Sequence, residues 1–254
     1  MEESSKKLNV LDNGKQQQNE LLKELTEVEK QELLLRIARH LILHSSFCPY
    51  SGLLKGKMGV AIFFYELFNA TNQKVYDDYA GDLIDEIYEK IKYNSSPYFN
   101  DGLAGIGWGF EYIIRKKYVG ADADDILDSL DKQIMERDVR KITNIDLDRG
   151  LKGIAHYIIA RCANRDKYMI ETQYIKDLIN AFKLQATQSQ EVLILTSFLI
   201  AIIQHQTIQE SEIFALEKYI KTVQYESENI FNEKRTLGIL DNGYASIGLK
   251  LLKS

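Results

Sequence analysis

Charged and amide side chains gather around four glycine-containing stretches of the chain. They are Lys55, Asn100, Asp101, Asp148, Arg149, Lys152, Asp241 and Asn242. If each stretch begins a helix, the free N–H groups and partial positive charge of that helix start favour an anionic or polar ligand. We therefore predict these residues as a candidate binding site, and we assign no catalytic residue.

The same pattern also has a structural interpretation, which takes precedence. Short polar side chains such as Asp101, Asp148 and Asn242 can cap the free N–H groups of a helix. Glycine within a helix costs about 1 kcal/mol relative to alanine, so its repeated use needs an offsetting reason. Close approach of neighbouring helices, or backbone angles that other residues resist, would supply that reason.

Thiol and imidazole groups, the usual zinc ligands, are few and scattered. The chain has Cys48, Cys162, His40, His44, His156 and His205. His40 and His44 have the i, i+4 spacing of ligands on a helix, but they lie among leucines and lack the rest of a motif. A small buried cysteine is an ordinary core residue. We predict no metal site and no cofactor.

His156 is the most tempting candidate for acid–base chemistry, because it lies one helical turn after Lys152. Each glycine-containing stretch has an equivalent position, and it holds Gly59, Trp108 and Leu249 in the other copies. A position that accepts such different side chains is typical of one that serves packing rather than catalysis. We therefore interpret His156 as a structural residue. The aspartates from Asp122 to Asp131 are likewise interpreted as the acidic first turn of a helix rather than a calcium loop.

The four glycine-containing stretches are copies of one motif. Aligned on Gly56, Gly105, Gly153 and Ser246, they are separated by 49, 48 and 93 residues. The last step is close to two further periods, and a fixed period in this range indicates a repeat architecture.

Helical patterns alternate between two kinds along the chain. Amphipathic segments, which we predict as outer helices, span 21–43, 76–92, 122–134, 174–184 and 213–225. Other segments are apolar nearly all round and must be enclosed by further elements. They follow the motif copies: one spans 60–68, one ends at about Arg115, one begins at the copy that starts with Asp148, and one lies in the closing copy. A fifth segment, 192–203, takes the same place in the alternation but lacks the glycines. Short connections make each pair an antiparallel hairpin. The inner helices are then parallel, and their N-termini meet at one end, which we call the mouth.

Composition limits the class of protein. The 254 residues are 45% apolar and 27% charged with a net charge of −5 and no basic block, which argues against a nucleic-acid partner. Neither a secretory signal nor an apolar run long enough to span a membrane is found. We predict a cytoplasmic protein with a disordered tail over residues 1–20 and one domain over 21–254.

Glycine motifs at the start of parallel inner helices resemble the lanthionine synthetase C-like (LanC-like) family. The most specific stretches are Gly102-Leu-Ala-Gly-Ile-Gly-Trp-Gly109 and Leu240-Asp-Asn-Gly-Tyr-Ala-Ser-Ile-Gly-Leu-Lys-Leu-Leu252. The resemblance implies an all-α fold, an α/α toroid of about five helical hairpins with parallel inner helices. It also implies a role in ribosomal-peptide modification. Family members that are cyclases bind zinc at the mouth, and the metal activates a peptide cysteine thiol that adds to a dehydrated Ser or Thr.

This sequence departs from the family where the zinc ligands belong. The family places cysteine and histidine at the starts of inner helices, whereas the corresponding segments here are Leu54-Lys-Gly56, Leu103-Ala-Gly105, Leu151-Lys-Gly153 and Tyr244-Ala-Ser246. The chain also has fewer hairpins than the family's closed ring, which implies an incomplete or open toroid. No metal ligand or catalytic residue can be transferred from the family.

Three functions remain from these observations. The favoured one is a non-catalytic or zinc-free LanC-like protein that binds a peptide substrate or a partner modification enzyme at the mouth. The alternative is a cyclase that joins a peptide thiol to a dehydrated residue. A weaker alternative is an α/α-barrel carbohydrate enzyme, for which Asp101, Asp148 and Asp241 would be the candidate carboxylates.

Overall fold

The computed structural model describes residues 25–91, 96–184, 189–220, 230–231 and 235–253. Within these ranges every regular element is a helix, which confirms the prediction of an all-α fold. The predicted tail over residues 1–20 lies outside the described residues. No helix in the described ranges is long and apolar enough to cross a membrane.

Outer and inner helices alternate along most of the chain, in the order α2 (Glu27–Ser45) and α3 (Lys57–Thr71), α4 (Lys74–Ile91) and α5 (Leu103–Arg115), α6 (Ala123–Met135) and α7 (Leu151–Cys162), and α8 (Thr172–Lys183) and α9 (Gln190–Ile203). The prediction that each outer helix pairs with the inner helix after it is wrong for α4 and α6, because α4 packs against α3 and α6 against α5. Short elements follow, namely α10 (Glu210–Ile213) and the 3-10 turns Leu216–Lys218 and Leu240–Asn242, and α11 (Tyr244–Leu251) is the last inner helix. A further 3-10 turn, Val139–Lys141, connects α6 to α7.

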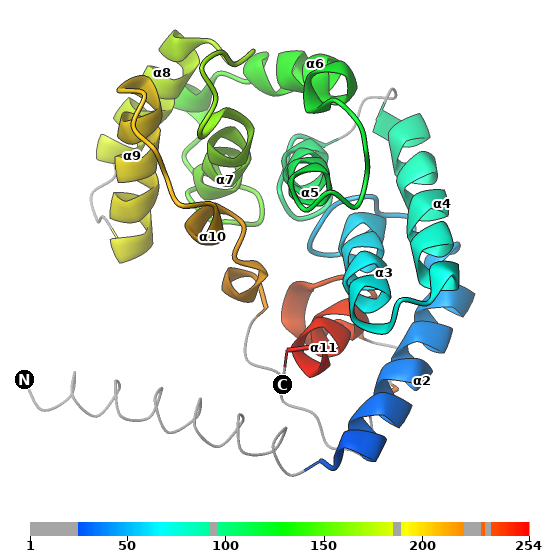
Figure 1. Cartoon of the computed structure of the whole chain (residues 1–254). Coiled ribbons are helices and arrows are strands. Elements are labelled where there is room, and N and C mark those ends of the chain that lie inside the picture. Colours follow the sequence, from blue (N-terminus) through cyan, green and yellow to red (C-terminus); the bar gives the residue numbers. More distant parts are fainter. Residues whose placement is uncertain (1–24, 92–95, 185–188, 221–229, 232–234, 254) are drawn as a thin grey trace, which may run out of the picture.

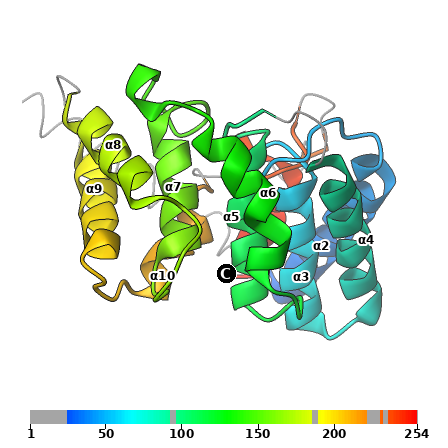
Figure 2. The ribbon, with the colours of Figure 1, turned by 90° about the horizontal axis from the view of Figure 1, so that it is seen from above.

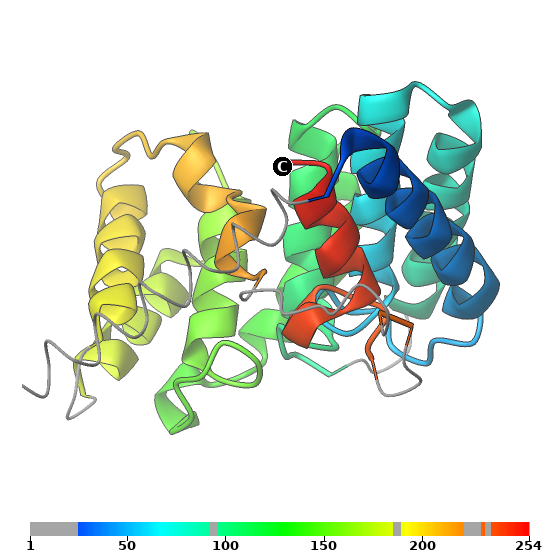
Figure 3. The ribbon, with the colours of Figure 1, turned by 90° about the horizontal axis from the view of Figure 1, so that it is seen from below.

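The inner helices stand in a curved row in the order α11, α3, α5, α7, α9, with neighbours packed side by side (Figures 1 and 2). The last inner helix therefore packs beside the first one, against both α2 and α3. Figure 3 shows α11 in red beside α2 in blue, with α9 in yellow at the opposite side of the molecule from α2. The row is an open curve, and α10 lies on its inner side, between α7 and α11 (Figure 1).

Backbone hydrogen bonds join the motif copies at the mouth. The N–H of Asn100 donates to the carbonyl of Asp148 (3.1 Å), and the carbonyl of Asn100 accepts from the N–H of Leu54 (3.1 Å). The N–H of Leu240 donates in turn to the carbonyl of Leu54 (2.7 Å). This belt of hydrogen bonds runs from the closing copy through the first and second copies to the third. It satisfies backbone groups that would otherwise be buried without partners.

Close packing, rather than backbone angle, explains the glycines of the motif. A Cβ atom on Gly105 would lie 2.0 Å from the carbonyl oxygen of Phe99, and one on Gly153 would lie 2.5 Å from the Cβ of Phe99. No described glycine has a positive φ angle. The proposal that these positions need special backbone angles is therefore wrong, and the proposal of close approach is confirmed.

The predicted side-chain caps at the helix starts are also wrong. The N-cap residues of α3, α5, α7 and α11 are Gly56, Gly102, Gly150 and Gly243, and none has a side-chain capping bond. Asp101 lies one position too early, and its carboxylate contacts Arg149 instead. The interpretation of the aspartates after Asp122 as the acidic start of a helix is confirmed, because Asp122 is the N-cap of α6 and its carboxylate accepts from the N–H of Asp124 (2.8 Å).

The predicted outer helix over 213–225 does not form as a single element. Helix α10 ends at Ile213, and the chain continues through a 3-10 turn to Ile220, beyond which the structure describes nothing until residue 230. Phe214 and Tyr219 turn inward and pack against Trp108 on α5, with ring centroids 5.6 and 5.1 Å away. Burial of these aromatic side chains in the inner face of the ring outweighs the helical propensity of the segment.

Candidate functional site

Two of the predicted site residues pair with each other at the mouth. The Arg149 guanidinium lies 3.3 Å from the Asp101 carboxylate, and it also lies over the ring of Tyr98. Lys152 pairs elsewhere, with Glu191 at the start of α9 (2.6 Å). Two of the positive charges at the mouth, Arg149 and Lys152, are therefore neutralised by carboxylates.

The other predicted residues act mainly through their backbones. Asn100, Asp148 and Lys55 are joined in the belt of hydrogen bonds, with the Lys55 N–H donating to the Asn100 carbonyl (3.3 Å). The carbonyl of Asn242 accepts from the Arg235 guanidinium (2.6 Å). Asp241 belongs to a 3-10 turn, and its side chain is outside what the structure describes. These contacts hold the mouth together, and none of them is itself a ligand site.

A cavity of about 410 Å³ opens between α7, α9 and the segment 210–220. One end of the cavity reaches the mouth. It is lined there by Gln190 and Glu191, at the start of α9, and by Leu147, just before α7. Its walls are mainly apolar, and the apolar side chains among them are Leu147, Ile159, Ile194, Leu195, Phe198 and Ile213. A largely apolar pocket with a few polar groups is typical of a ligand-binding site.

Helix α9 supplies one wall of the cavity because it ends the row. Only Val192, Leu195, Leu199 and Ile202 are buried along its length. Ile194 remains 42% exposed and Leu193 47% exposed, on a helix that is apolar nearly all round. The prediction that α9 is enclosed therefore holds for one face of the helix only. In the described structure no further inner helix packs against its other face.

His156 lies in the wall of this cavity, 8% exposed. Its Nδ1 is 3.0 Å from the hydroxyl of Tyr219, and its Nε2 has no hydrogen-bond partner among the described residues. Oε1 of Glu191 lies 3.7 Å from Nε2, and Lys218 and Lys152 also act on the imidazole electrostatically. Nε2 is buried beside the Glu191 carboxylate.

The electrostatics of the cavity follow from burial and from these contacts. Burial lowers the pKa of His156, so its imidazole is neutral at pH 7. The imidazole and then the Lys152 ammonium lower the pKa of Glu191 to about 2, so this carboxylate is ionised. Burial also raises the pKa of Tyr219, which keeps its hydroxyl protonated. The cavity therefore presents a neutral imidazole beside a carboxylate.

The residues at the helix starts do not fit a zinc ion. None of the side chains in the corresponding segments offers a thiolate or imidazole; these segments are Leu54-Lys-Gly56, Leu103-Ala-Gly105, Leu151-Lys-Gly153 and Tyr244-Ala-Ser246. Within the described ranges, no three His, Cys, Asp or Glu side chains are grouped as metal ligands would be. His40 and His44 stack on each other, with ring centroids 4.0 Å apart, and Nδ1 of His44 is hydrogen-bonded to the carbonyl of His40.

Both thiols are expected to react slowly in the folded protein. Cys48 is 8% exposed and Cys162 is 1% exposed, and burial raises the pKa of each thiol. Because the thiolate is the reactive form, iodoacetamide at pH 7.5 should alkylate Cys48 slowly and Cys162 more slowly still. Peptide mapping over time would measure both rates, with the urea-unfolded chain as control. Equally fast labelling in the folded and unfolded protein would contradict these positions.

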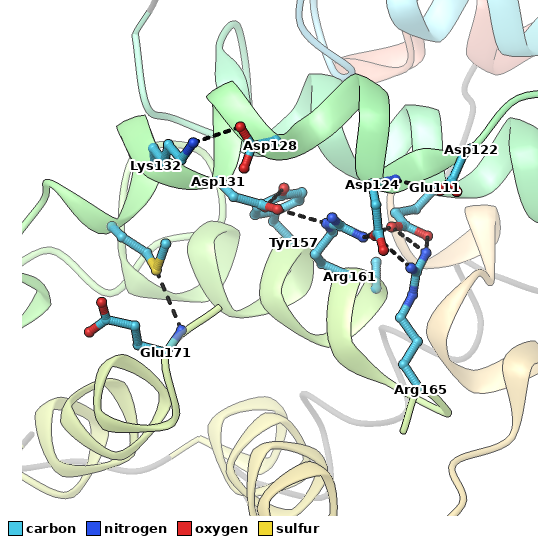
Figure 4. Close-up of polar contacts among 12 residues, drawn as sticks. Glu111, Asp122, Asp124, Asp128, Asp131, Lys132, Tyr157, Arg161, Arg165 and Glu171 are labelled. Carbon is cyan, nitrogen blue, oxygen red and sulfur yellow. Dashed lines mark hydrogen bonds and ion pairs between the residues drawn. The ribbon is translucent and has the colours of Figure 1, made fainter. Parts of the chain in front are cut away.

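A second polar cluster lies at the opposite end of the inner helices (Figure 4). Arg161 at the end of α7 is fully buried, and its guanidinium contacts Asp131 (2.9 Å), Glu111 (3.2 Å) and Asp124 (2.6 Å). Arg165 makes two further bonds to Glu111 (3.0 Å each). The cluster joins α5, α6 and α7, and sequence patterns alone did not reveal it.

Burial controls the ionisation of this cluster. It raises the pKa of Glu111 and Asp131 despite the neighbouring arginines, and it raises the pKa of Tyr157, whose hydroxyl donates to Asp131. Each carboxylate of the cluster has an arginine partner, and the cavity between α7 and α9 is not lined by any of them. The cluster is therefore a structural clamp between three helices, and the cavity between α7 and α9 is the better candidate for function.

Comparison with known proteins identifies the region that carries the repeat. A family model described as lanthionine synthetase C-like protein matches residues 50–196, more than half of the chain. The match runs from the loop before α3 into α9 and so includes three of the motif copies and two helices that line the cavity. A search of curated proteins finds no match.

Proposed function

Because the chain belongs to the lanthionine synthetase C-like family, we propose that it serves ribosomal-peptide modification of the lanthipeptide type as a zinc-free, non-catalytic peptide-binding protein. The peptide would be a modification substrate, or a segment of a partner modification enzyme, and the location would be cytoplasmic. The peptide binds at the mouth, with one of its side chains in the cavity between α7 and α9.

The observation that carries this proposal is the cavity itself. It begins at the helix starts, where the family's ligands are expected, and it is walled by apolar side chains of α7 and α9. His156, Gln190 and Glu191 supply polar groups in this mainly apolar lining, the combination that a ligand pocket requires.

The donor set at the mouth supports binding over zinc-dependent cyclisation. A cyclase of this family needs thiolate or imidazole ligands, and the matched positions carry leucine, lysine and serine. The two thiols of the chain are buried and hold raised pKa values, so they are poor substitutes. The carbohydrate-enzyme alternative is weakened because Asp101 is paired with Arg149 and the family match points to peptides.

Peptide selection tests the binding function. Phage displaying random twelve-residue peptides would be panned on the immobilised full chain, and enriched peptides would be synthesised and titrated by calorimetry. Ile194→Glu places a charge in the cavity wall and is expected to weaken binding at least tenfold. Leu193→Glu is the matched control, since Leu193 is similarly exposed on the same helix but does not line the cavity. Absence of enriched peptides, or equal binding by both variants, would overturn the proposal.

A cyclisation assay separates the proposal from the cyclase alternative. A synthetic peptide with one cysteine and one dehydroalanine would be incubated with the protein, with and without added zinc. Loss of free thiol, read by alkylation and mass spectrometry, should proceed at the uncatalysed rate in both cases. A rate increase that depends on the protein would show an enzyme.

A further inference from the structure

A groove of about 320 Å³ runs between α8 and α9. It shares no residue with the cavity described above. On α9 the cavity is lined by residues such as Ile194 and Phe198, whereas the groove is lined by Ile200, Ile203 and Gln204. At about 3.6 residues per turn, these two sets point to opposite sides of α9. The groove is therefore a separate surface, at the end of the row that lies beyond α7 in Figure 2.

The repeat shows what normally lies in such a groove. Along the row, an outer helix packs against the inner helix that precedes it: α4 against α3, α6 against α5, and α8 against α7. Helix α8 also reaches back to α6, because the hydroxyl of Tyr174 donates to the carbonyl of Ile134 (3.0 Å). The helix after α9 does not take the corresponding place, since α10 has only 4 residues and packs against α7. The groove between α8 and α9 is therefore a position for an outer helix that no described helix of this chain occupies.

The two walls of the groove differ in character. Ile200 and Ile203 on α9 are one turn apart and form an apolar wall beside the buried Ile179, and Ile200 is 37% exposed. Lys176 and Lys183 on α8 are exposed and lie seven residues apart, which places them on the same face of that helix. One side of the groove is thus apolar and the other is positively charged.

No carboxylate of the described residues lines the groove to balance these lysines. Asp177, the acidic residue nearest to them on α8, contacts other groups instead. Its carboxylate accepts from the side-chain amide of Gln173 (2.8 Å) and lies 3.9 Å from the Arg140 guanidinium. The lysine wall therefore offers its charge to a partner from outside the described chain.

An amphipathic helix with acidic flanks complements both walls. A stripe of apolar side chains at i, i+3 and i+7 packs against Ile200 and Ile203, as helices do when they bind in apolar grooves. Carboxylates beside that stripe then lie next to Lys176 and Lys183, where opposite charges favour association. A second copy of the chain related by a two-fold axis would instead bring the lysine walls of both copies into one interface, and like charges there are unfavourable.

We propose that this groove docks an acidic amphipathic helix of a partner protein, in the place that an outer helix takes in the other repeats. The docked helix covers the exposed Ile200 and extends the row of helices at its open end. Neither the glycine motif nor the family match assigns this surface, and the match ends at residue 196. The inference does not depend on the proposed peptide-binding function, because the groove and the cavity lie on opposite sides of α9.

Two designed peptides test the charge of the partner helix. Each would be a three-heptad helix with leucine at positions a and d, a hydrocarbon staple on its outer face and a fluorescent label. They would differ only in carrying glutamate or lysine at positions e and g. Fluorescence anisotropy with the full chain would measure both affinities. We expect the glutamate peptide to bind about tenfold more tightly than the lysine peptide, because its flanks attract the two ammonium groups of the groove.

Charge reversal in the protein assigns this preference to the groove. The double variant Lys176→Glu, Lys183→Glu should reverse the order of the two affinities, and both positions are exposed, so the change is compatible with folding. Lys132→Glu, Lys141→Glu is the matched control, since these lysines are also exposed but do not line the groove, and it should leave the order unchanged. Ile200→Glu should weaken both peptides about tenfold or more, because it places a charge in the apolar wall.

Each outcome supports or overturns the docking surface. Equal affinity of the two peptides for the wild type, or an order that survives in Lys176→Glu, Lys183→Glu, overturns it. Sedimentation equilibrium of the chain alone tests the other occupant, because a dimer that Ile200→Glu dissociates would show that a second copy fills the groove. A monomer whose preference is reversed by the double variant supports the partner helix. These results are the same whether or not a peptide binds in the cavity, so the proposed function is tested separately.

Discussion

Arg161→Met is expected to destabilise the folded protein by about 3–5 kcal/mol, the usual effect of removing one partner from a buried ion pair. Arg161 is fully buried, and Asp131 is 1% exposed. Glu111 would keep Arg165, but Asp131 would lose the arginine that neutralises it and retain only Tyr157. Urea unfolding followed by circular dichroism would measure the loss. We expect a lower urea concentration at the midpoint, with an unchanged slope of the unfolding free energy against urea concentration.

Two further variants separate charge from packing. Arg161→Met with Asp131→Asn removes the carboxylate left without a partner, so part of the lost stability should return. Arg140→Met is the matched control, because Arg140 is exposed and pairs with Asp138 at the surface (2.7 Å), where such pairs contribute about 1 kcal/mol or less. Equal losses for Arg161→Met and Arg140→Met would contradict the burial of the clamp.

The loss should also depend on pH. Burial raises the folded-state pKa of Asp131 above that of an exposed aspartate, so its ionisation costs stability as the pH rises through the folded pKa. Arg161 opposes this effect, and its removal raises the folded pKa further. The difference in unfolding free energy between wild type and Arg161→Met should therefore be smaller at pH 5 than at pH 8. A larger difference at pH 5 would show that Asp131 is not the group left unpaired.

Gly105→Ala is expected to destabilise the protein by about 2 kcal/mol or more. The added Cβ would lie 2.0 Å from the Phe99 carbonyl oxygen, and this backbone belongs to the loop that carries the hydrogen-bond belt. Relief of such a contact requires a backbone shift rather than a change of rotamer, and overpacking of this kind costs about 1–3 kcal/mol or more. Thermal unfolding of the variant would measure the effect.

Gly81→Ala provides the control, since it is the same substitution in α4, where a Cβ would meet nothing within 4 Å. Without a steric clash the helical preference of alanine dominates, and this variant should gain about 0.5–1 kcal/mol. The two variants are thus predicted to shift stability in opposite directions. A shift of the same sign in both would mean that the glycines of the motif are retained for some reason other than close packing.

The repeat of the glycine motif allowed most of the fold to be predicted, because its aligned glycines Gly56, Gly105 and Gly153 are places where backbone segments approach closely. The spacing of Gly56, Gly105 and Gly153 located three inner helices and the end at which they start. It did not identify the capping residues, since a carboxylate one position too early cannot reach the free N–H groups. The approximate boundaries of the outer helices followed from their apolar stripes.

The candidate site was harder to predict because its parts do not repeat. The position of His156 is buried, as its equivalents Gly59 and Trp108 indicated, yet its neighbours come from α9 and from the segment after it. Glu191 belongs to the copy that lacks glycines, and Tyr219 to a segment that was predicted as an outer helix. No periodicity could place either residue beside an imidazole on α7.

The packing of α11 against α2 and α3 determines when the protein can finish folding during synthesis. Helices α4 to α7 can dock as they leave the ribosome, because α4 and α5 pack against α3, and α6 and α7 pack against α5, which in each case is made earlier. One flank of α3 has no partner until α11 is made, and the bond from Leu240 to Leu54 closes a loop that spans nearly all the described helices. Closure of so long a loop carries a large entropic cost and gives the domain a non-local final step. The nascent chain would therefore expose an apolar flank of α2 and α3 throughout the synthesis of the other inner helices.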